Sequence, residues 1–509
     1  MNTILAYDLG TGGCKASLYD AAGVQLAAVF RAYETFYPHS GWHEQRPRDW
    51  WDAVVSSTRE LLATSGVEPA TVRCIALSGQ SLTVVPLDAN GQLLRETVPI
   101  WSDTRPVEQA AHYFERVDAN DWYMKTGNGF ARETYSVFKI MWYRDHEPDL
   151  FARTEVVLGS KDYINFRLTG MIRTDHSYAS GSGVYDLRQR MFDRGLLAAS
   201  GLRPELFPSI VESTEALGTL TASAAEALGL SQDVVVFCGG VDNACMALGA
   251  GNTREGSVYL SLGSSAWLAV SSEHPVVDLS IKPFVFAHVI PHQFTSATSI
   301  FAAGSSFRWL RDVVCSDIKQ QAEAEGHDVY DSMVELALQS PIGANRLFFN
   351  PSLAGGSAAY GNPNMRGAFL GLDLCHTRAD LVRAVLEGIT FDLCIMYQRL
   401  CQLVALEDDI LMVGGGSNSA RWRQMFANVF ARPFTKANVG QDAASLGAAA
   451  VAAVGSGLWA GFDAVDSLIV REDLASPEPE QVARYRAILE VYEQTWRPLS
   501  AIADLMGAL

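Results

Sequence analysis

The chain has 509 residues, of which 48% are hydrophobic and 19% are charged, and its formal net charge at pH 7 is −18. This composition is typical of a globular protein that is long enough for two or more domains with substantial cores. The strong negative charge argues against nucleic acid and anionic membrane surfaces as partners. A small anionic ligand stays compatible with it, because backbone amides can hold phosphate without net positive charge.

No targeting signal, membrane span or cysteine framework is recognised in the sequence. The N-terminus leads directly into an apolar strand, and the most apolar run, residues 448–454, is too short and too rich in alanine to cross a bilayer. The eight cysteines form no Cys-x-x-Cys pair, and the ten histidines are dispersed. We therefore expect a cytoplasmic protein with reduced cysteines and without a Cys/His metal site.

The chain begins with a strand, a glycine-rich turn and a second strand, over residues 4–18. The turn contains Gly10 and Thr11, and Asp8 lies just before it. The next predicted elements are strands over residues 24–30, 72–78 and 83–87 and an amphipathic helix over residues 49–65.

A second strand, turn and strand of the same design occupies residues 258–268, with its turn at Gly263 and Ser264. A third glycine turn, at residues 414–416, follows another apolar strand. The repetition predicts two α/β domains of similar design with a cleft between them and a boundary near residues 245–255. A further strand is predicted over residues 234–237, before this boundary. The other predicted elements of the second half are a helix that includes Trp422 and Phe430 and a closely packing helix of small residues over 443–453.

The glycine-rich turns are candidates for phosphate binding. Such a turn points consecutive N–H groups into one concavity, and two facing turns would hold the phosphate chain of a nucleotide between two lobes. Only the first turn is preceded by an acidic residue, Asp8, where the second has Ser261. An Asp beside phosphate is a natural Mg²⁺ ligand, and the alternative is an Asp that caps its own turn. Three turns that each follow an apolar strand favour nucleotide binding.

Asp242 is the second candidate carboxylate. It follows Gly239 and Gly240 at the end of a predicted buried strand. A carboxylate at a strand end that faces a cleft can accept a proton from a substrate hydroxyl. The alternative is a helix N-cap, a position that Asp fills often. The glycine pair favours catalysis, because it would allow a ligand to approach closely.

Two further groups are candidate ligand contacts. Trp101, Asp103 and Arg105 combine an aromatic ring, a carboxylate and a guanidinium after a strand, which is the mixture that sugar sites use. The alternative is a core Trp with a surface Asp–Arg pair. Arg308 follows Gly304 on a predicted helix and would border the nucleotide, unless it is a solvated surface residue.

Several segments resemble the FGGY carbohydrate kinases, and the resemblance covers essentially the full chain. Residues 367–372, followed after a seven-residue spacer by residues 380–387, look like the C-terminal signature of this family. Residues 139–142 (Lys-Ile-Met-Trp), with Ser136 upstream, look like its other signature in a slightly degraded form. Residues 161–163 (Lys-Asp-Tyr) are similar to a segment of xylulokinases and gluconate kinases.

The resemblance implies an α/β fold of two duplicated actin/Hsp70-like (ribonuclease H-like) domains with ATP in the cleft between them. It divides the chain into a sugar- and phosphate-binding domain, residues 1–248, and a nucleotide-binding domain, residues 249–509. It implies that Asp8 helps to place Mg²⁺ and that Asp242 is the base on the sugar hydroxyl. The γ-phosphoryl group would move in line to the sugar oxygen, so that catalysis rests mainly on positioning and charge stabilisation.

The resemblance also assigns binding residues. The residues expected at the nucleotide are Gly10, Thr11, Lys15, Gly263 and Ser264 near the phosphates, Gly304 and Arg308 at its flank, and Gly415 and Asn418 beside adenosine. The residues expected at the sugar are Gln80, Ser81, Leu82, Trp101, Asp103 and Asp242.

The sugar loop departs from the family pattern. In xylulokinases the sequence of this loop is similar to Gly-Gln-Met-His-Gly, and glycerol kinases carry an Arg-Glu pair there. This chain has Ser81 and Leu82 after Gln80. We expect a xylulokinase-like enzyme that converts D-xylulose to D-xylulose 5-phosphate in a pocket that departs from the standard one. A kinase for gluconate, ribulose or another ketose or polyol is an alternative.

A non-catalytic regulator that binds sugar or nucleotide on the same fold is an alternative of another class, against which the presence of both Asp8 and Asp242 argues. The expected partners are a small sugar and ATP, without nucleic acid or membrane. A homodimer is one assembly that the sequence leaves open.

Overall fold

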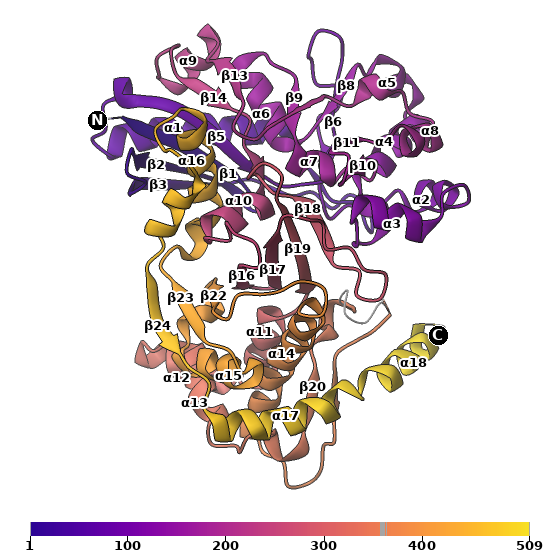
Figure 1. The fold of residues 1–509 in the computed structure, drawn as a ribbon, viewed down its shortest axis with the longest axis vertical. Helices are drawn as coiled ribbons and strands as arrows, with labels where there is room; N and C mark the ends of the chain where they lie inside the picture. The colour runs from indigo at the N-terminus through magenta and orange to yellow at the C-terminus, as the bar shows by residue number, and fades with distance from the viewer. Residues whose placement is uncertain (1, 357–361, 363, 508–509) are drawn as a thin grey trace.

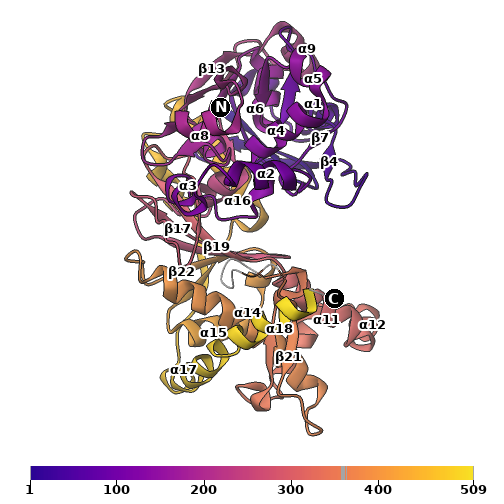
Figure 2. The same ribbon diagram turned by 90° about the vertical axis from the view of Figure 1, so that its right-hand side faces the viewer.

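The computed structural model of the protein describes residues 2–356, 362 and 364–507. It contains two seven-stranded mixed sheets, one from each half of the chain. Figure 1 shows the two halves one above the other, and Figure 2 shows strands β17 and β19 between the bulk of the two halves. The predicted two-domain α/β fold is confirmed.

The first half of the chain forms the upper part of Figure 1. The strands of its sheet are β1 (Thr3–Leu9), β2 (Gly13–Asp20), β3 (Gln25–Ala32), β5 (Val72–Gly79), β13 (Ala216–Thr219), β14 (Val235–Phe237) and β15 (Gly240–Val241). Smaller pairs are β4 (Glu44–Gln45) with β7 (Val98–Pro99), β6 (Val85–Leu87) with β8 (Val156–Leu158), β9 (Arg173–Asp175) with β12 (Ser209–Val211), and β10 (Tyr185–Asp186) with β11 (Met191–Phe192). The helices are α1 (Pro47–Thr64), α2 (Val107–Phe114), α3 (Ala119–Thr126), α4 (Ser136–His146), α5 (Pro148–Arg153), α6 (Ser160–Thr169), α7 (His176–Ser180), α8 (Arg194–Ser200), α9 (Ala222–Leu228) and α10 (Asp242–Gly249).

The second half contributes the lower sheet. Its strands are β16 (Val258–Leu262), β17 (Ala266–Ser272), β18 (Phe284–Ala287), β19 (Phe294–Ile300), β22 (Ile410–Val413), β23 (Phe434–Ala437) and β24 (Arg471–Ala475), with β20 (Phe348–Asn350) and β21 (Ala368–Leu370) as a separate pair. Its helices are α11 (Gly304–Val313), α12 (Ser316–Glu325), α13 (Val329–Ala337), α14 (Arg378–Leu400), α15 (Ala420–Phe430), α16 (Ala443–Gly455), α17 (Pro479–Glu493) and α18 (Trp496–Gly507).

The two sheets share one strand order and one pattern of directions. In the first sheet β3, β2 and β1 pair antiparallel in that order, and β5 and β14 continue parallel to β1. In the second sheet β19, β17 and β16 pair antiparallel, and β22 and β23 continue parallel to β16. An antiparallel strand, β13 or β24, ends each sheet on that side. The duplication expected from the sequence is thus present in the topology.

The strand ends of the first sheet gather polar groups at one edge. In the register of β1 and β5, Asp8 lies beside Ser78, and the Ser78 hydroxyl donates a hydrogen bond of 2.7 Å to Asp8 Oδ1. Strand β15 also pairs with β5, with Gly240 beside Ser78, and Asp242 follows it directly. Ligands of open α/β sheets bind outside the carboxyl ends of the strands, so this edge is where a site is expected.

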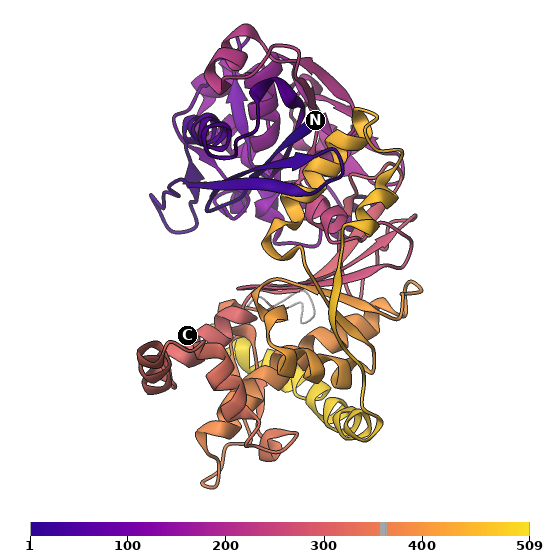
Figure 3. The same cartoon turned by 90° about the vertical axis from the view of Figure 1, so that its left-hand side faces the viewer.

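Helix α16 joins the two halves of the chain. It comes late in the sequence, yet Figures 1 and 3 show it against the elements of the first half. A Cβ on Gly447 of α16 would lie 1.9 Å from the carbonyl oxygen of Cys245 in α10, and a Cβ on Gly249 would lie 1.8 Å from that of Ala443. Only glycine permits this approach of two helices. The predicted close packing of the small-residue helix is confirmed.

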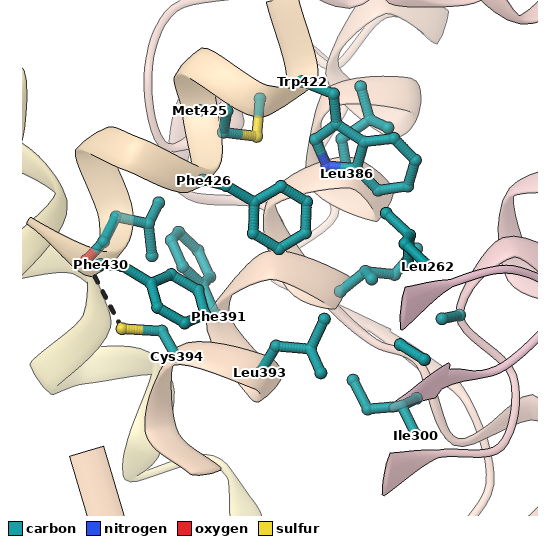
Figure 4. Packing of buried hydrophobic residues seen from close by; sticks show 14 of the residues in the cluster. Leu262, Ile300, Leu386, Phe391, Leu393, Cys394, Trp422, Met425, Phe426 and Phe430 are labelled. Atoms are coloured by element: carbon teal, nitrogen blue, oxygen red, sulfur yellow. Dashed lines mark hydrogen bonds between the residues drawn. The ribbon is translucent and has the colours of Figure 1, made fainter. Parts of the chain in front are cut away.

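The core of the second domain is built on α14 and α15. Helix α14 has 23 residues, most of them buried, and α15 carries the aromatic face expected from its sequence. Figure 4 shows Trp422, Phe426 and Phe430 of α15 in one cluster with Phe391 of α14 and Leu262 of β16. Because this core holds Leu262, it also fixes the start of the turn that follows β16.

Among the described residues, no helix combines the length and the hydropathy that crossing a membrane requires. The cysteines all carry free thiols; Cys375 and Cys401 are exposed and the other six are buried.

Candidate active site

A cleft of about 970 Å³ lies between the two domains. Its lining includes Thr11 from the first hairpin turn and Ser265 from the second, so that the two turns face one space. Leu82 and Trp101 line it from loops of the first domain, and Asp242 lines it from the start of α10. The structure therefore brings candidate phosphate turns, candidate sugar contacts and a candidate base to one cleft.

Asp8 lies at the end of β1, next to that lining. It is partly exposed and is bonded to the Ser78 hydroxyl. Burial raises the pKa of Asp8, although the Ser78 hydrogen bond and the charge of Lys15 lower it. A carboxylate with a raised pKa is one whose negative charge is poorly compensated, which a nearby cation would correct.

Asp242 is the first residue of α10, and Val241 is the N-cap residue. Asp242 Oδ1 accepts a hydrogen bond of 2.8 Å from the N–H of Asn243, and the helix has no side-chain capping bond. The N-cap alternative is therefore not what the structure shows. Burial, and then the charge of Asp8, raise the pKa of Asp242 to about 7. Such a carboxylate is basic enough to take a proton near neutral pH.

The glycine pair before Asp242 has another reason than the one expected. Gly239 has φ +72°, and a Cβ there would lie 2.0 Å from the carbonyl oxygen of Leu77. A Cβ on Gly240 would lie 2.2 Å from a methyl carbon of Val289. Neither glycine is among the described residues that line the cleft. The interpretation that the pair admits a ligand is wrong, because the pair admits the protein's own neighbouring atoms.

The first hairpin turn is held from its sides. The Tyr33 hydroxyl donates to the carbonyl oxygen of Gly10 at 2.5 Å, and Gln45 Nε2 donates to that of Thr11 at 2.7 Å. The Trp101 indole N–H donates to the Thr11 hydroxyl at 2.9 Å. These bonds fix Gly10 and leave Thr11 in the lining of the cleft.

Lys15 is already engaged. It lies opposite Asp8 in the register of β1 and β2, and its ammonium forms an ion pair with Asp442 just before α16. Burial lowers the pKa of Lys15, while the charge of Asp8 raises it. A phosphate contact would require Lys15 to exchange Asp442 for the phosphate.

Four of the predicted nucleotide residues lie together in the second domain. The N–H groups of Gly304 and Ser305 donate to the carbonyl oxygens of Gly263 and Ser264, at 3.1 and 2.9 Å. A Cβ on Gly304 would lie 2.2 Å from the Gly263 oxygen, so this contact requires glycine. Arg308, one turn further along α11, donates from Nη2 to the Ser264 hydroxyl at 2.7 Å.

The third glycine turn lies beside the second. Gly415–Asn418 form a 3₁₀ turn between β22 and α15, and Gly415 and Asn418 are both exposed. Gly414 has φ +88°, and a Cβ there would lie 2.7 Å from the carbonyl oxygen of Leu262. The structure thus places the expected adenosine border next to the end of β16, where Gly263 follows.

The sugar loop has only part of its side chains in the cleft. Ser81 and Leu82 line it, whereas Gln80 is buried and not among the described lining residues. Gln80 Nε2 donates to Gln45 Oε1 at 2.8 Å. Leu82 has φ +59°, which is a strained conformation for a non-glycine residue. The backbone that presents the apolar Leu82 side chain is therefore held by its surroundings.

Lys139 supplies that hold. Its buried ammonium donates to the carbonyl oxygens of Leu82 at 3.0 Å, Ile100 at 2.7 Å and Trp101 at 3.4 Å. Burial lowers the pKa of Lys139 to about 7. One side chain from the degraded signature helix thus fastens two loops of the cleft to each other.

The aromatic and charged residues of the other loop separate. Trp101 is 42% exposed and lines the cleft. Asp103 is fully buried, accepts the His43 N–H at 2.7 Å and is bonded to Arg105 Nε and Nη2 at 2.9 and 2.7 Å. The Arg105 guanidinium lies over the Trp42 ring, 3.9 Å from its centroid. Asp103 and Arg105 thus pair with each other in the interior and are not among the described lining residues.

Comparison with known proteins decides the family. Residues 3–249 match the N-terminal domain of the FGGY family of carbohydrate kinases, and residues 258–456 match its C-terminal domain. The chain belongs to the FGGY family of carbohydrate kinases. It is therefore a sugar kinase, and membership of this family implies ATP as a substrate.

Relatives and solved structures that are similar to this chain match it over nearly its whole length. The chain is 30% identical over 509 residues to the xylulose kinase of Staphylococcus epidermidis, which covers 99% of this chain and 98% of that protein. The structure of xylulose kinase from Rhodospirillum rubrum superposes with a TM-score of 0.90 at 29% identity and covers 99% of this chain and 100% of that one. The gluconate kinase from Lactobacillus acidophilus superposes with a TM-score of 0.91 at 25% identity and covers 99% of both chains.

Several residues that line the cleft of this FGGY kinase are not predicted from its sequence. Phe130 of the first domain stacks on Phe284 of β18, with ring centroids 3.7 Å apart, and Trp267 of β17 lies against Phe284 at 5.9 Å. These three rings form an aromatic wall from both domains. Asn243, next to Asp242, also lines the cleft, and its position beside the candidate base is the one sequence signal that pointed to any of them.

The pKa of Asp242 predicts two effects of pH. With Asp242 as the candidate base, kcat/KM should fall as pH drops below about 7, because a protonated carboxyl group cannot accept a proton. The second effect concerns the free energy of unfolding. The pKa of Asp242 is about 7 in the folded protein and 3.8 ordinarily, so the folded state keeps a proton that the unfolded state releases. The free energy of unfolding therefore decreases as pH rises from about 4 to 7. In Asp242→Asn this decrease does not occur, because the amide group does not titrate. The melting temperature of this variant, measured without ligands, should exceed the wild-type value more at pH 8 than at pH 5.5.

If kcat/KM has the same value below and above pH 7, after correction for enzyme stability, the first effect is contradicted. A difference in melting temperature that does not grow with pH would contradict the second.

Proposed function

We propose that this FGGY kinase phosphorylates D-xylulose to D-xylulose 5-phosphate, with ATP and Mg²⁺, and that Asp242 is its general base. The observation that carries the proposal is the cleft between the domains, in which Thr11 and Ser265 of two opposed hairpin turns and Asp242 line one space. The similarity to xylulose kinases over nearly the full length supports the choice of sugar. A cytoplasmic location is part of the proposal.

In this proposal Asp242 takes the proton of the sugar hydroxyl as its oxygen attacks the γ-phosphorus. The bond from that phosphorus to the β,γ-bridging oxygen breaks, and ADP leaves. The raised pKa of Asp242 supports the role, because a carboxylate whose pKa is about 7 can both bind the proton and release it at neutral pH. Asp242 is partly buried, so fewer water molecules compete with the sugar hydroxyl for its carboxylate.

Asp8 is the residue proposed to hold Mg²⁺. Asp8 suits a Mg²⁺ ion because it is a carboxylate at a strand end whose pKa is raised by burial. A second carboxylate, Asp242, is close enough that the charge of Asp8 raises its pKa. Mg²⁺ is usually held by one or two carboxylates, phosphate oxygens and water. A bound Mg²⁺ would supply charge neutralisation on the β- and γ-phosphates. The described residues contain no group of three or more His, Cys, Asp or Glu that could hold a metal ion without such phosphates.

The nucleotide contacts follow the same geometry. The backbone around Gly10 and Thr11 on one side and Gly263 and Ser264 on the other is proposed to contact the phosphates, with Lys15 as a further contact after it releases Asp442. Arg308, held to the Ser264 hydroxyl, supports an anion at this place. Gly304 is proposed to flank the nucleotide, and Gly415 and Asn418 to border adenosine.

The sugar side is proposed to consist of Ser81, Leu82, Trp101 and Asp242, with Gln80, Asp103 and Arg105 behind the surface. Leu82 makes this wall apolar, which suits a deoxy or less hydroxylated position of a substrate. Gluconate is the second candidate, because the lining also holds two cationic side chains, Arg132 and Lys282, that could pair with a carboxylate.

The substrate is tested by ranking kcat/KM over ketoses, polyols and aldonic acids. Because Ser81 and Leu82 lack a histidine partner for a sugar hydroxyl, we expect a KM for D-xylulose that is roughly ten- to a hundred-fold above that of the double variant Ser81→Met, Leu82→His. A matched control is Ser102→Ala, which alters another lining hydroxyl outside this loop. Should the double variant gain nothing while D-xylulose already leads the panel with a low KM, the interpretation of the loop fails. A leading rank for gluconate would favour the second candidate.

The homodimer remains a prediction of the sequence. Light scattering of the purified protein tests it directly.

A further inference from the structure

A charged cluster lies buried beneath the cleft without lining it. Lys161 of α6 forms ion pairs with Asp162 at 2.5 Å and with Asp175, the last residue of β9, at 2.9 Å, and all three side chains are at most 1% exposed. The Thr174 hydroxyl donates to Asp162 Oδ2 at 2.7 Å. A buried ion pair is weak support for stability, since apolar residues of similar volume often replace one without loss. The cluster therefore invites another explanation.

One hydroxyl connects this cluster to the candidate base. The Ser177 hydroxyl donates to Asp175 Oδ2 at 2.5 Å and accepts the N–H of Val241 at 3.0 Å. Both the Ser177 side chain and Val241 are buried. Val241 is the N-cap residue of α10, directly before Asp242. The chain of contacts runs from the Lys161 ammonium through Asp175 and Ser177 to the backbone that carries the Asp242 side chain.

The other contacts near Asp242 leave its orientation to this backbone. The Asp242 carboxylate accepts from Asn243, its own neighbour in the chain, and makes no capping bond. A second bond, this one from α6, holds the same segment three residues upstream of Val241: Asn165 Nδ2 donates to the carbonyl oxygen of Cys238 at 2.8 Å. Helix α6 and the cluster thus fix both ends of the short connection between β14 and α10.

We infer that Ser177, held by the buried Lys161–Asp175 pair, is a positioning residue that aims Asp242 into the cleft. The inference rests on the proposed role of Asp242 as the base. Asp175 is ionised, because the charge of Lys161 and the Ser177 hydrogen bond outweigh its burial and keep its pKa low. Its negative charge polarises the Ser177 hydroxyl, whose oxygen then accepts more strongly from the Val241 N–H.

The chain offers a matched control. The Ser213 hydroxyl also donates to Asp175 Oδ2, at 2.9 Å, and it is buried like that of Ser177. No hydrogen bond from its side chain reaches Val241 among the described residues. Ser213→Ala therefore removes an equivalent bond from the cluster and leaves the contact to the base intact.

The experiment compares Ser177→Ala, Ser213→Ala and Asp242→Asn in full-length protein, with kcat, KM for ATP and for D-xylulose, and melting temperature. We expect the two serine variants to melt at similarly lowered temperatures. Ser177→Ala should lose about ten- to a hundred-fold in kcat, the scale of a misplaced catalytic group, with an unchanged KM for ATP. Ser213→Ala should keep its kcat within about two-fold. Ser177→Cys, whose thiol is a weaker acceptor, should fall between wild type and Ser177→Ala and serves if the alanine variant does not fold.

Equal kcat in Ser177→Ala and Ser213→Ala, while Asp242→Asn is strongly impaired, would overturn the positioning role alone. A normal kcat in Asp242→Asn would instead overturn the proposed base and the positioning role with it.

Discussion

Asp242→Asn should bind both substrates but turn over roughly 10²–10⁴-fold more slowly than the wild type, the usual worth of general base catalysis. The amide has nearly the same shape as the carboxyl group, so the N–H of Asn243 keeps an oxygen acceptor. It cannot take the proton of the sugar hydroxyl. The comparison is made by coupled detection of ADP, with binding of a non-hydrolysable ATP analogue followed by calorimetry.

Glu133→Gln provides the matched control for this loss. Glu133 is the other carboxylate among the described residues that line the cleft, and no role is assigned to it. Its amide variant should retain wild-type turnover. If both variants were equally active, the assignment of the base would be wrong, whereas equal loss in both would mean that the charge of the cleft as a whole matters.

Asp8→Ala should lower kcat by about 100-fold or more and raise the Mg²⁺ concentration needed for half-maximal activity. The loss is on the scale of removing one preorganised electrostatic contact from a phosphoryl-transfer site. Asp8 lies two residues before the glycine of the first hairpin turn, and Ser261 takes this place in the second hairpin. Activity is measured as a function of free Mg²⁺ at saturating ATP and sugar.

Ser78→Ala separates the carboxylate from its support. This variant removes the 2.7 Å hydrogen bond to Asp8 but keeps the charge, so its Mg²⁺ dependence should shift much less than that of Asp8→Ala. An Asp8→Ala enzyme with a normal Mg²⁺ titration and normal turnover would place the metal elsewhere.

The positions of the main elements were predictable because they depend on local patterns. The helix expected over residues 49–65 is α1, Pro47–Thr64, and the small-residue helix expected over residues 443–453 is α16, Ala443–Gly455. Apolar periodicity and the glycines at the turns determine such elements within a few residues. The repeated hairpins also revealed the duplication, since each strand pairing within a hairpin is set by its own turn.

The surroundings of the site residues were less predictable, because their partners lie far away in the sequence. Lys15 pairs with Asp442, 427 residues further along the chain, so no local pattern shows that its ammonium is engaged. Asp103 points to Arg105 and away from the cleft, which depends on tertiary packing around Trp42. The buried contact from Ser177 to Val241 likewise connects two elements that only the folded sheet brings together.

We propose that the γ-phosphoryl group of ATP is transferred in the cleft to a sugar hydroxyl with the help of Asp242. The products formed from Mg²⁺-ATP and D-xylulose by the wild type and by Asp242→Asn can be compared directly by ³¹P NMR. The wild type should form ADP and a sugar monophosphate in equal amounts, and the variant should form almost none of either. ADP with free phosphate and no sugar phosphate, or equal product from the variant, would contradict the proposal.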